Sequence, residues 1–406
     1  MKRHEQPTCL FVLPRPYVSS ARESPTGSSR ETADAVALFP RRGAPGQRGG
    51  VTTDALRVVR YGRGEQDNLF AFLREALSPA DAERLIRQWH WKYEANPFNP
   101  EDDPYILLLK DGERLAGMYG RLFYRVAIDG QQYWAHHGCD LALHPAYRGR
   151  GLTTRLTDHD KVESEIHFSW QNEASYRAFQ RDRTSGAPFT SLVRPLDLRR
   201  ALRAFRGDGG LARTAAWLIG GVSERWPIKR RRVASGLTVT RIHSFDERFD
   251  RLWQRVCRDY PVIVIRDRTY LEWRFTQRPD ASYTILAASR GAELTGYMVT
   301  RQVERAGERW GYLVDFLVQD RDRSVFAVLV EEAVGDLRRE RAVAVGCRFA
   351  VPLLRRMLYR HGFVPLAWGP KGYVRARARL PDPATRQFGA GDWFLTMGDG
   401  DLEMSL

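Results

Sequence analysis

The stretch from residue 141 to residue 154 constrains the fold more than any other part of the sequence. It contains alternating apolar residues typical of a strand, a His–Pro turn, and the run Arg–Gly–Arg–Gly at 148–151 before a helix. Glycine has no Cβ, so the backbone at Gly149 and Gly151 can turn sharply and approach a ligand closely. The N-terminus of the next helix would present unpaired amides and a positive dipole to that ligand. The pattern predicts a strand–loop–helix unit that binds a phosphate-bearing cofactor.

The order of these residues resembles the acyl-CoA-binding motif of the GNAT acetyltransferase superfamily, in which Arg/Gln-x-x-Gly-x-Gly/Ala follows a strand. Arg148, Gly151 and Thr153 occupy the three fixed positions, and Thr153 departs from the small residue expected there. The resemblance implies acetyl-CoA as co-substrate and no metal. It also implies that backbone groups of the strand and the residues of the loop hold the cofactor: Leu141, Leu143, Arg148, Gly149, Arg150, Gly151, Leu152 and Thr153. The alternative is an ordinary turn rich in arginine and glycine.

The elements predicted around this loop have the order of a GNAT domain. Capping residues, hydrophobic periodicity and turn signals predict helices over 68–80, 81–93, 154–162 and 174–181. Strands are expected over 105–110, 134–143, 165–170 and 189–196, with two strands' worth of extended chain over 115–128. The fold class expected is α/β (α+β), with a mixed sheet in each of two GNAT-like domains.

The second half of the chain repeats the first. Trp91, Lys92 and Tyr93 match the Trp–Arg–Phe step at 273–275, and a hairpin with a glycine, Gly117 or Gly296, follows each step. The strand that contains Asp315 matches the strand that contains Asp140. The counterpart of the glycine loop, Gln–Asp–Arg–Asp–Arg at 319–323, has no glycine, and its acids oppose phosphate. The second copy is therefore expected to be degenerate, although chance similarity in an arginine-rich chain is the alternative.

These features predict a disordered low-complexity arm over 1–50, a GNAT N-acetyltransferase domain over 51–200, a linker over 201–236 and a degenerate GNAT-like domain over 237–406. The net charge of +15 would attract polyanions, but arginine is spread along the whole chain, and no nucleic-acid partner is expected. The four cysteines show neither a disulfide framework nor zinc spacing, which favours a cytoplasmic protein. No apolar run is long enough to predict a membrane span. The sequence does not determine the oligomeric state.

The candidate general bases lie on or beside the strand before the loop. Asp140 and His136 share one face of that strand unless a bulge intervenes, and His137 faces the opposite side. By resemblance, Asn172 fits the asparagine that many GNAT domains carry, but Phe179 replaces the tyrosine that would serve as general acid. Tyr176, one helical turn earlier, is the substitute expected, and protonation by solvent is the alternative.

The function expected is an acyl-CoA-dependent N-acyltransferase that moves an acetyl group from acetyl-CoA directly to an amine. The acceptor, a small-molecule or peptide amine, is not readable from the sequence. One alternative is a non-catalytic module that binds acyl-CoA or a partner, which Phe179 and Thr153 favour. The other is an aminoacyl transferase of the cell-wall peptide type. The Gly–Asp–Gly–Asp run at 398–401 lacks the further ligands of a metal loop and is expected to be only a turn.

Overall fold

The computed structural model describes residues 56–100, 104–158, 166–171, 187–204, 236–305, 307–349, 352–365, 372–378, 392–401 and 403–404. The arm expected over 1–50, most of the expected linker, the helix expected over 174–181 and the candidates Asn172 and Tyr176 lie outside these residues.

The first half follows the predicted order of elements. Its helices are α1 (Gln66–Ala76), α2 (Pro79–Trp89), a π-helical turn η3 (His90–Glu94) and α3 (Leu152–Asp158). Its strands are β1 (Leu56–Arg60), β2 (Ile106–Asp111), β3 (Arg114–Ile128), β4 (Gln131–Leu143) and β5 (Ile166–Gln171). The side chain of Ser78 caps α2 by accepting from the Asp81 amide, and Pro79 stands at the first helical position. The extended chain predicted over 115–128 is one strand, β3, and not two.

The second half repeats this order. Its strands are β7 (Leu237–Ile242), β8 (Val262–Val264), β9 (Tyr283–Arg290), β10 (Glu293–Arg305), β11 (Glu308–Val318), β12 (Ala344–Phe349), β13 (Val364–Pro365), β14 (Gly372–Ala378) and β15 (Trp393–Phe394). Its helices are α7 (Glu247–Val256), α8 (Arg268–Phe275), the short 3₁₀ turn η6 (Gln319–Arg321), α9 (Arg323–Arg339) and α10 (Pro352–Arg360). Two elements join the halves in sequence, β6 (Ala187–Pro195) and α5 (Leu198–Ala204).

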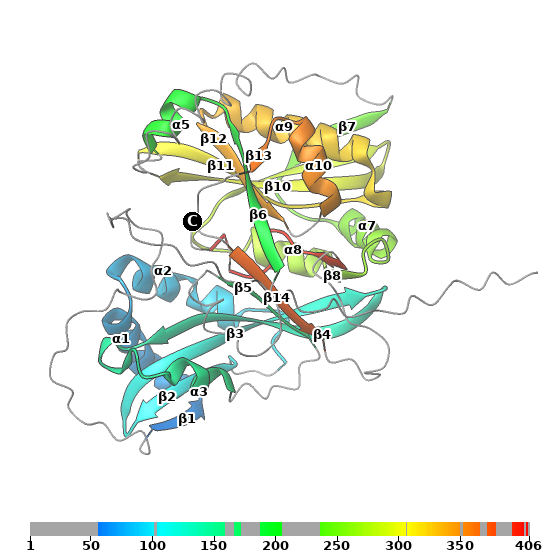
Figure 1. The fold of residues 1–406 in the computed structure, drawn as a ribbon. Helices are drawn as coiled ribbons and strands as arrows, with labels where there is room; N and C mark the ends of the chain where they lie inside the picture. Colours follow the sequence, from blue (N-terminus) through cyan, green and yellow to red (C-terminus); the bar gives the residue numbers. More distant parts are fainter. Residues whose placement is uncertain are drawn as a thin grey trace, which may run out of the picture.

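The two halves exchange strands. β6 comes before the linker, yet it pairs antiparallel with β12 and β13 of the second half. β14 comes near the end of the chain, yet it pairs antiparallel with β5 of the first half. β6 and β14 also pair with each other, so within the described residues the strands form one continuous series from β1 to β7. Figure 1 shows the two halves stacked, with β6 and β14 crossing between them.

Matching environments in the two halves support the predicted repeat. Gly117 of β3 pairs with Leu143, and Gly296 of β10 pairs with Val318. A Cβ added to Gly117 would lie 2.6 Å from Leu143, and one added to Gly296 would lie 2.9 Å from Val318. Both glycines are therefore required by close approach of the next strand.

The two copies meet at a reciprocal pair of tryptophans. Trp91 Nε1 donates to the Trp273 carbonyl at 2.6 Å, and Trp273 Nε1 donates to the Trp91 carbonyl at 3.0 Å. Their rings stack with centroids 5.3 Å apart and planes 22° apart. Such reciprocity is what a twofold relation between two similar units produces.

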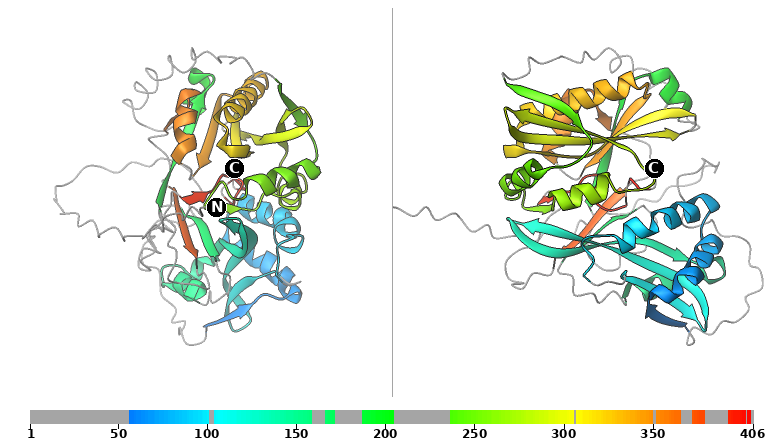
Figure 2. Two further views of the ribbon diagram at one scale, coloured as in Figure 1. Left: turned by 90° about the vertical axis from the view of Figure 1, so that its right-hand side faces the viewer. Right: turned by 180° about the vertical axis from the view of Figure 1, so that it is seen from behind.

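One cluster of buried apolar side chains runs through both halves, from Tyr61 to Met404 near the chain end. A second, smaller cluster lies beneath α3 and includes Leu143, Leu152 and Leu156. The C-terminal residues lie between the halves in both views of Figure 2. In the part of the chain that the structure describes, no helix combines the length and the apolar character needed to cross a membrane.

Candidate active site

The candidate site begins where β4 and β5 part. These parallel strands pair only through residues 135–137 of β4 and 166–168 of β5. β4 then continues to Leu143 while it remains paired with β3 on its other side. Among the described residues, nothing pairs with the β5-facing edge of β4 beyond His137. Unpaired backbone groups on a strand edge can bind an extended ligand as an added strand would.

The glycine loop follows the end of β4. Gly149 and Gly151 adopt φ of +74° and +71°, which L side chains rarely adopt, and no heavy atom lies within 4 Å of a Cβ built on either. The conformation of the loop therefore requires both glycines, and the space in front of them is open. Leu152, the first residue of α3, is buried and fixes the start of the helix.

The two arginines of the loop have different positions. Arg148 Nε donates to the Leu143 carbonyl at 3.0 Å, and its Nη2 donates to the Ala76 carbonyl at 2.5 Å. This side chain therefore ties the loop to the ends of β4 and α1. Arg150 is exposed, and its Cζ lies 5.7 Å from the centroid of the Tyr147 ring. Its guanidinium therefore remains available to a charged ligand. Leu141 and Thr153 are half-buried.

Asp140 lies at a bulge in β4. The register with β3 shifts there, and Asp140 takes a φ of +49°. Its Oδ2 accepts from Lys92 Nζ at 2.6 Å and from the Tyr93 hydroxyl at 2.5 Å. Lys92 and Tyr93 come from η3 and were not among the predicted site residues. The repeated aromatic–basic–aromatic step that contains them was the available signal.

Because of the bulge, His136 and His137 have different neighbours from Asp140. His136 is buried, and its Nε2 lies 2.7 Å from Nδ1 of His167 on β5. His137, also buried, has Nδ1 3.2 Å from the Phe168 carbonyl and Nε2 2.9 Å from Asp401 Oδ1. The predicted exception, a bulge that breaks the alternation between His136 and Asp140, is present.

Burial and charge set the protonation of this cluster. Burial alone would lower the pKa of Lys92, but Asp140 and Asp401 raise it above its ordinary value. Burial, reinforced by Asp140, raises the pKa of Tyr93 well above its usual range, so its hydroxyl stays a proton donor. Burial also raises the pKa of the Cys139 thiol. Cys139 is therefore not activated as a nucleophile, which favours direct transfer over a cysteine-bound intermediate.

Gly120 leaves room for the Tyr93 hydroxyl. A Cβ at Gly120 would lie 2.1 Å from that oxygen, so Gly120→Ala must push Tyr93 away from Asp140. We expect a loss of about 1–3 kcal/mol in unfolding free energy, measured by urea denaturation. Adding Tyr93→Phe removes the clashing oxygen and should recover part of that loss. Equal stability of the single and double variants would contradict this packing argument.

In the second half, a side chain of the corresponding loop binds the backbone amides at the start of the next helix. Asp322 caps α9, and its Oδ1 accepts from the amides of Ser324 at 2.7 Å and Val325 at 3.2 Å. Burial opposes the charge of Asp322, but the bonds from Ser324 and Val325 lower its pKa overall. A carboxylate thus already occupies the amides that would receive a phosphate.

The described residues gather no three His, Cys, Asp or Glu side chains that could hold a metal ion. The Gly–Asp–Gly–Asp run at 398–401 is a turn, as expected, but its position was not foreseen. It is packed between the two halves, and the Asp399 side chain is completely buried against Arg266.

Comparisons with known proteins show what the chain is similar to. Solved structures share the fold over most of the chain. One is Saccharomyces cerevisiae N-myristoyltransferase with bound myristoyl-CoA, with 14% identity, a TM-score of 0.52, and coverage of 82% of this chain and 84% of that chain. Another is a GCN5-related N-acetyltransferase from Anabaena variabilis, with 12% identity, a TM-score of 0.53, and coverage of 79% of this chain and 72% of that chain. A probable N-acyltransferase from Enterococcus faecalis is also similar, with 17% identity, a TM-score of 0.52, and coverage of 80% of this chain and 72% of that chain. At these identities the likeness shows the fold alone, a mixed α/β fold with two mixed sheets.

The family described as "Acetyltransferase (GNAT) domain" matches residues 58–165. This part of the chain, which contains β4 and the glycine loop and ends just before β5, matches a GNAT domain. Curated proteins gave no sequence match.

Proposed function

We propose that the chain is an acyl-CoA-dependent N-acyltransferase that transfers an acetyl group from acetyl-CoA directly to an amine. The observation that carries the proposal is the open edge of β4, which leads into two left-handed glycines at the start of α3 within a GNAT domain. The pantetheine would lie along β4 beside Leu141 and Leu143. The pyrophosphate would lie over the amides of 149–153, with Arg150 beside it.

The reaction requires the amine nitrogen to attack the thioester carbon, so that a C–N bond forms and the C–S bond breaks. The amine loses a proton and the departing thiolate gains one. Asp140 is half-buried beside the unpaired strand edge and is our candidate to accept the amine proton, with His136 as the second candidate. Tyr93, held in its protonated form 2.5 Å from Asp140, joins Tyr176 as a candidate to protonate the thiolate. Asn172 stays in the proposed site as the asparagine that the family resemblance places before that tyrosine.

The acyl group and the acceptor require direct measurement. Thiol release should be followed with acetyl-, octanoyl- and myristoyl-CoA against mixed pools of small amines and peptides with free N-termini. Release that depends on both acyl-CoA and amine supports the proposal. CoA binding without release under all these conditions would favour a non-catalytic module. Amine acylation from aminoacyl-tRNA but not from acyl-CoA would favour the aminoacyl transferase.

Titration with CoA should give one site per chain and a Kd in the micromolar range, because only the first half has a glycine loop. Gly151→Glu should abolish binding, because it strains the left-handed backbone and places a negative charge where phosphate would lie. Gly291→Glu is the matched control: Gly291 also has a left-handed φ (+60°) and an open Cβ position, but it lies in the β9–β10 turn. Two sites per chain, or equal loss of binding in both variants, would contradict the assignment.

A further inference from the structure

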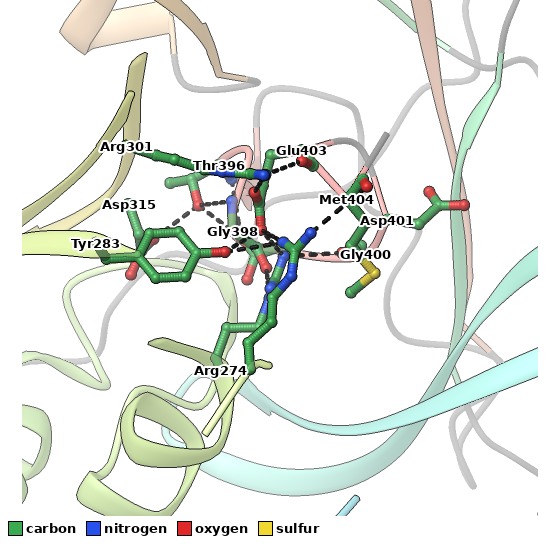
Figure 3. A network of polar contacts seen from close by, with 12 residues as sticks. Arg274, Tyr283, Arg301, Asp315, Thr396, Gly398, Gly400, Asp401, Glu403 and Met404 are labelled. Atoms are coloured by element: carbon green, nitrogen blue, oxygen red, sulfur yellow. Dashed lines mark hydrogen bonds and ion pairs between the residues drawn. The ribbon is translucent and has the colours of Figure 1, made fainter. Parts of the chain in front are cut away.

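The C-terminal segment 396–404 is anchored in the second half. The Gly398 amide donates to the Val314 carbonyl of β11 at 3.0 Å, as an added strand would. Asp399 pairs with the buried Arg266 at 2.7 Å, and Glu403 pairs with three arginines of the second half, Arg274, Arg278 and Arg301. Figure 3 shows this network and shows Asp401 directed away from it. The segment is therefore held in place independently of Asp401.

The same segment reaches the first half where β4 and β5 part. Asp401 lies 2.9 Å from His137, the last residue of β4 that pairs with β5. Trp170 Nε1 on β5 donates to the backbone carbonyl of Asp399. Gly400 packs between the two strands, since a Cβ there would lie 2.9 Å from Trp170 and 3.0 Å from His137. The segment therefore contacts both strands at the point where they part.

The hydrogen bonds of His137 join Asp401 to β5. Its Nδ1 faces the Phe168 carbonyl, and its Nε2 faces a carboxylate. His137 thus has one ring nitrogen directed at the backbone of β5 and the other directed at the C-terminal segment. Burial would raise the pKa of Asp401, but the charge and hydrogen bond of His137 lower it overall, which keeps the carboxylate ionised. The contacts of His137 thus connect the C-terminal segment, β4 and β5.

We propose that Asp401 is a positioning residue that acts through His137 to fix the separation of β4 and β5, and thereby determines which acyl groups the enzyme accepts. The inference rests on the proposed function. The glycine loop, where the pyrophosphate would lie, follows the C-terminal end of β4 at Leu143, beyond His137 along the strand. Asp401 should therefore influence the acyl end of the cofactor and leave the nucleotide end unchanged.

The test uses the full chain with Asp401→Asn, and Asp67→Asn as control, an exposed aspartate on α1. CoA without an acyl group is titrated, and kcat/KM is measured with acetyl-CoA and octanoyl-CoA. We expect the Kd for CoA to stay within about twofold, while the ratio of the two kcat/KM values changes about tenfold, within the range that pocket shape controls. The control should change neither quantity.

The outcomes separate the two proposals. If the wild-type chain binds no CoA and transfers no acyl group, the proposed function fails. If it transfers acyl groups and Asp401→Asn keeps the same ratio, the positioning role is overturned. Equal weakening of CoA binding and of turnover with both acyl-CoAs would indicate general structural damage and would also overturn it. Asp401→Glu keeps the charge but lengthens the side chain, so it replaces the Asn variant if that variant does not fold: a changed ratio supports the role, and an unchanged ratio overturns it.

Discussion

Replacing Glu403 with glutamine is expected to destabilise the protein by about 3–5 kcal/mol, because it leaves buried cations without their counter-charge. Glu403 is fully buried, and its carboxylate lies 2.5 Å from Arg274, 2.7 Å from Arg278 and 2.8 Å from Arg301. The Tyr283 hydroxyl donates to the same group at 2.8 Å. The loss should be measured by urea denaturation of the full chain.

Glu247→Gln is the matched control. Glu247 also pairs with an arginine, Arg251, but at 3.6 Å, and its side chain is 78% exposed. Exposed ion pairs contribute roughly 0–1 kcal/mol, so this variant should differ little from wild type. Similar losses in the two variants would show that the buried arginines do not depend on Glu403.

The ion pairs of Glu403 also predict that the stability of the protein depends on pH in the acid range. Burial opposes the charge of Glu403, but Arg274, Arg278 and Arg301 lower its pKa from 4.5 to about 2. A carboxyl whose pKa is lower in the folded state stabilises that state at any pH above its unfolded pKa. The contribution is lost as the pH falls from 4.5 towards 2. The wild-type chain should therefore lose stability more steeply in this window than Glu403→Gln, and parallel curves would contradict the assignment.

A fragment of residues 51–200 is expected not to fold by itself, although the sequence suggested a domain with these bounds. Without β14, the fragment leaves the edge of β5 unpaired, and its own β6 has lost the partners β12 and β13. Unpaired strand edges favour aggregation. The expected result is insoluble protein, or soluble protein without a cooperative thermal transition.

Co-expression of residues 201–406 should rescue the fragment, because that part supplies β14 and the strands that bind β6. Pull-down of one part with the other, followed by CoA titration, measures the rescue. A fragment that melts cooperatively and binds CoA alone would show that the exchanged strands are dispensable.

Local patterns predicted much of the fold. The apolar alternation before residue 144, the glycine run and the capping residues of α2 identified the strands, loop and helices of the first half. The repeat was readable because close strand packing requires Gly117 and Gly296 in both copies. The exchange of β6 and β14 was not predicted, because both strands have ordinary strand patterns and local sequence does not specify a distant partner.

The candidate site was predicted only in part for the same reason. The loop residues and Asp140 are close in sequence, so a motif could identify them. His137 and Asp401 are 264 residues apart, and only the packing of the C-terminal segment between the halves brings them together. The sequence indicated Lys92 only as part of the repeated aromatic–basic–aromatic pattern. Its ion pair with Asp140 depends on a bulge in β4, and the alternation of residues along a strand does not predict a bulge.

The reciprocal bonds of Trp91 and Trp273 give the chain the geometry of a homodimer joined into one polypeptide. In a twofold dimer, residue i of one subunit contacts residue j of the other and the reverse contact is also made. The exchanged strands fit the same description, since domain swapping trades identical elements between protomers. Fusion frees such a pair from the symmetry that two identical subunits must keep. One half can then retain an open glycine loop while the other closes its own with Asp322, an asymmetry that no symmetric dimer of identical chains could adopt.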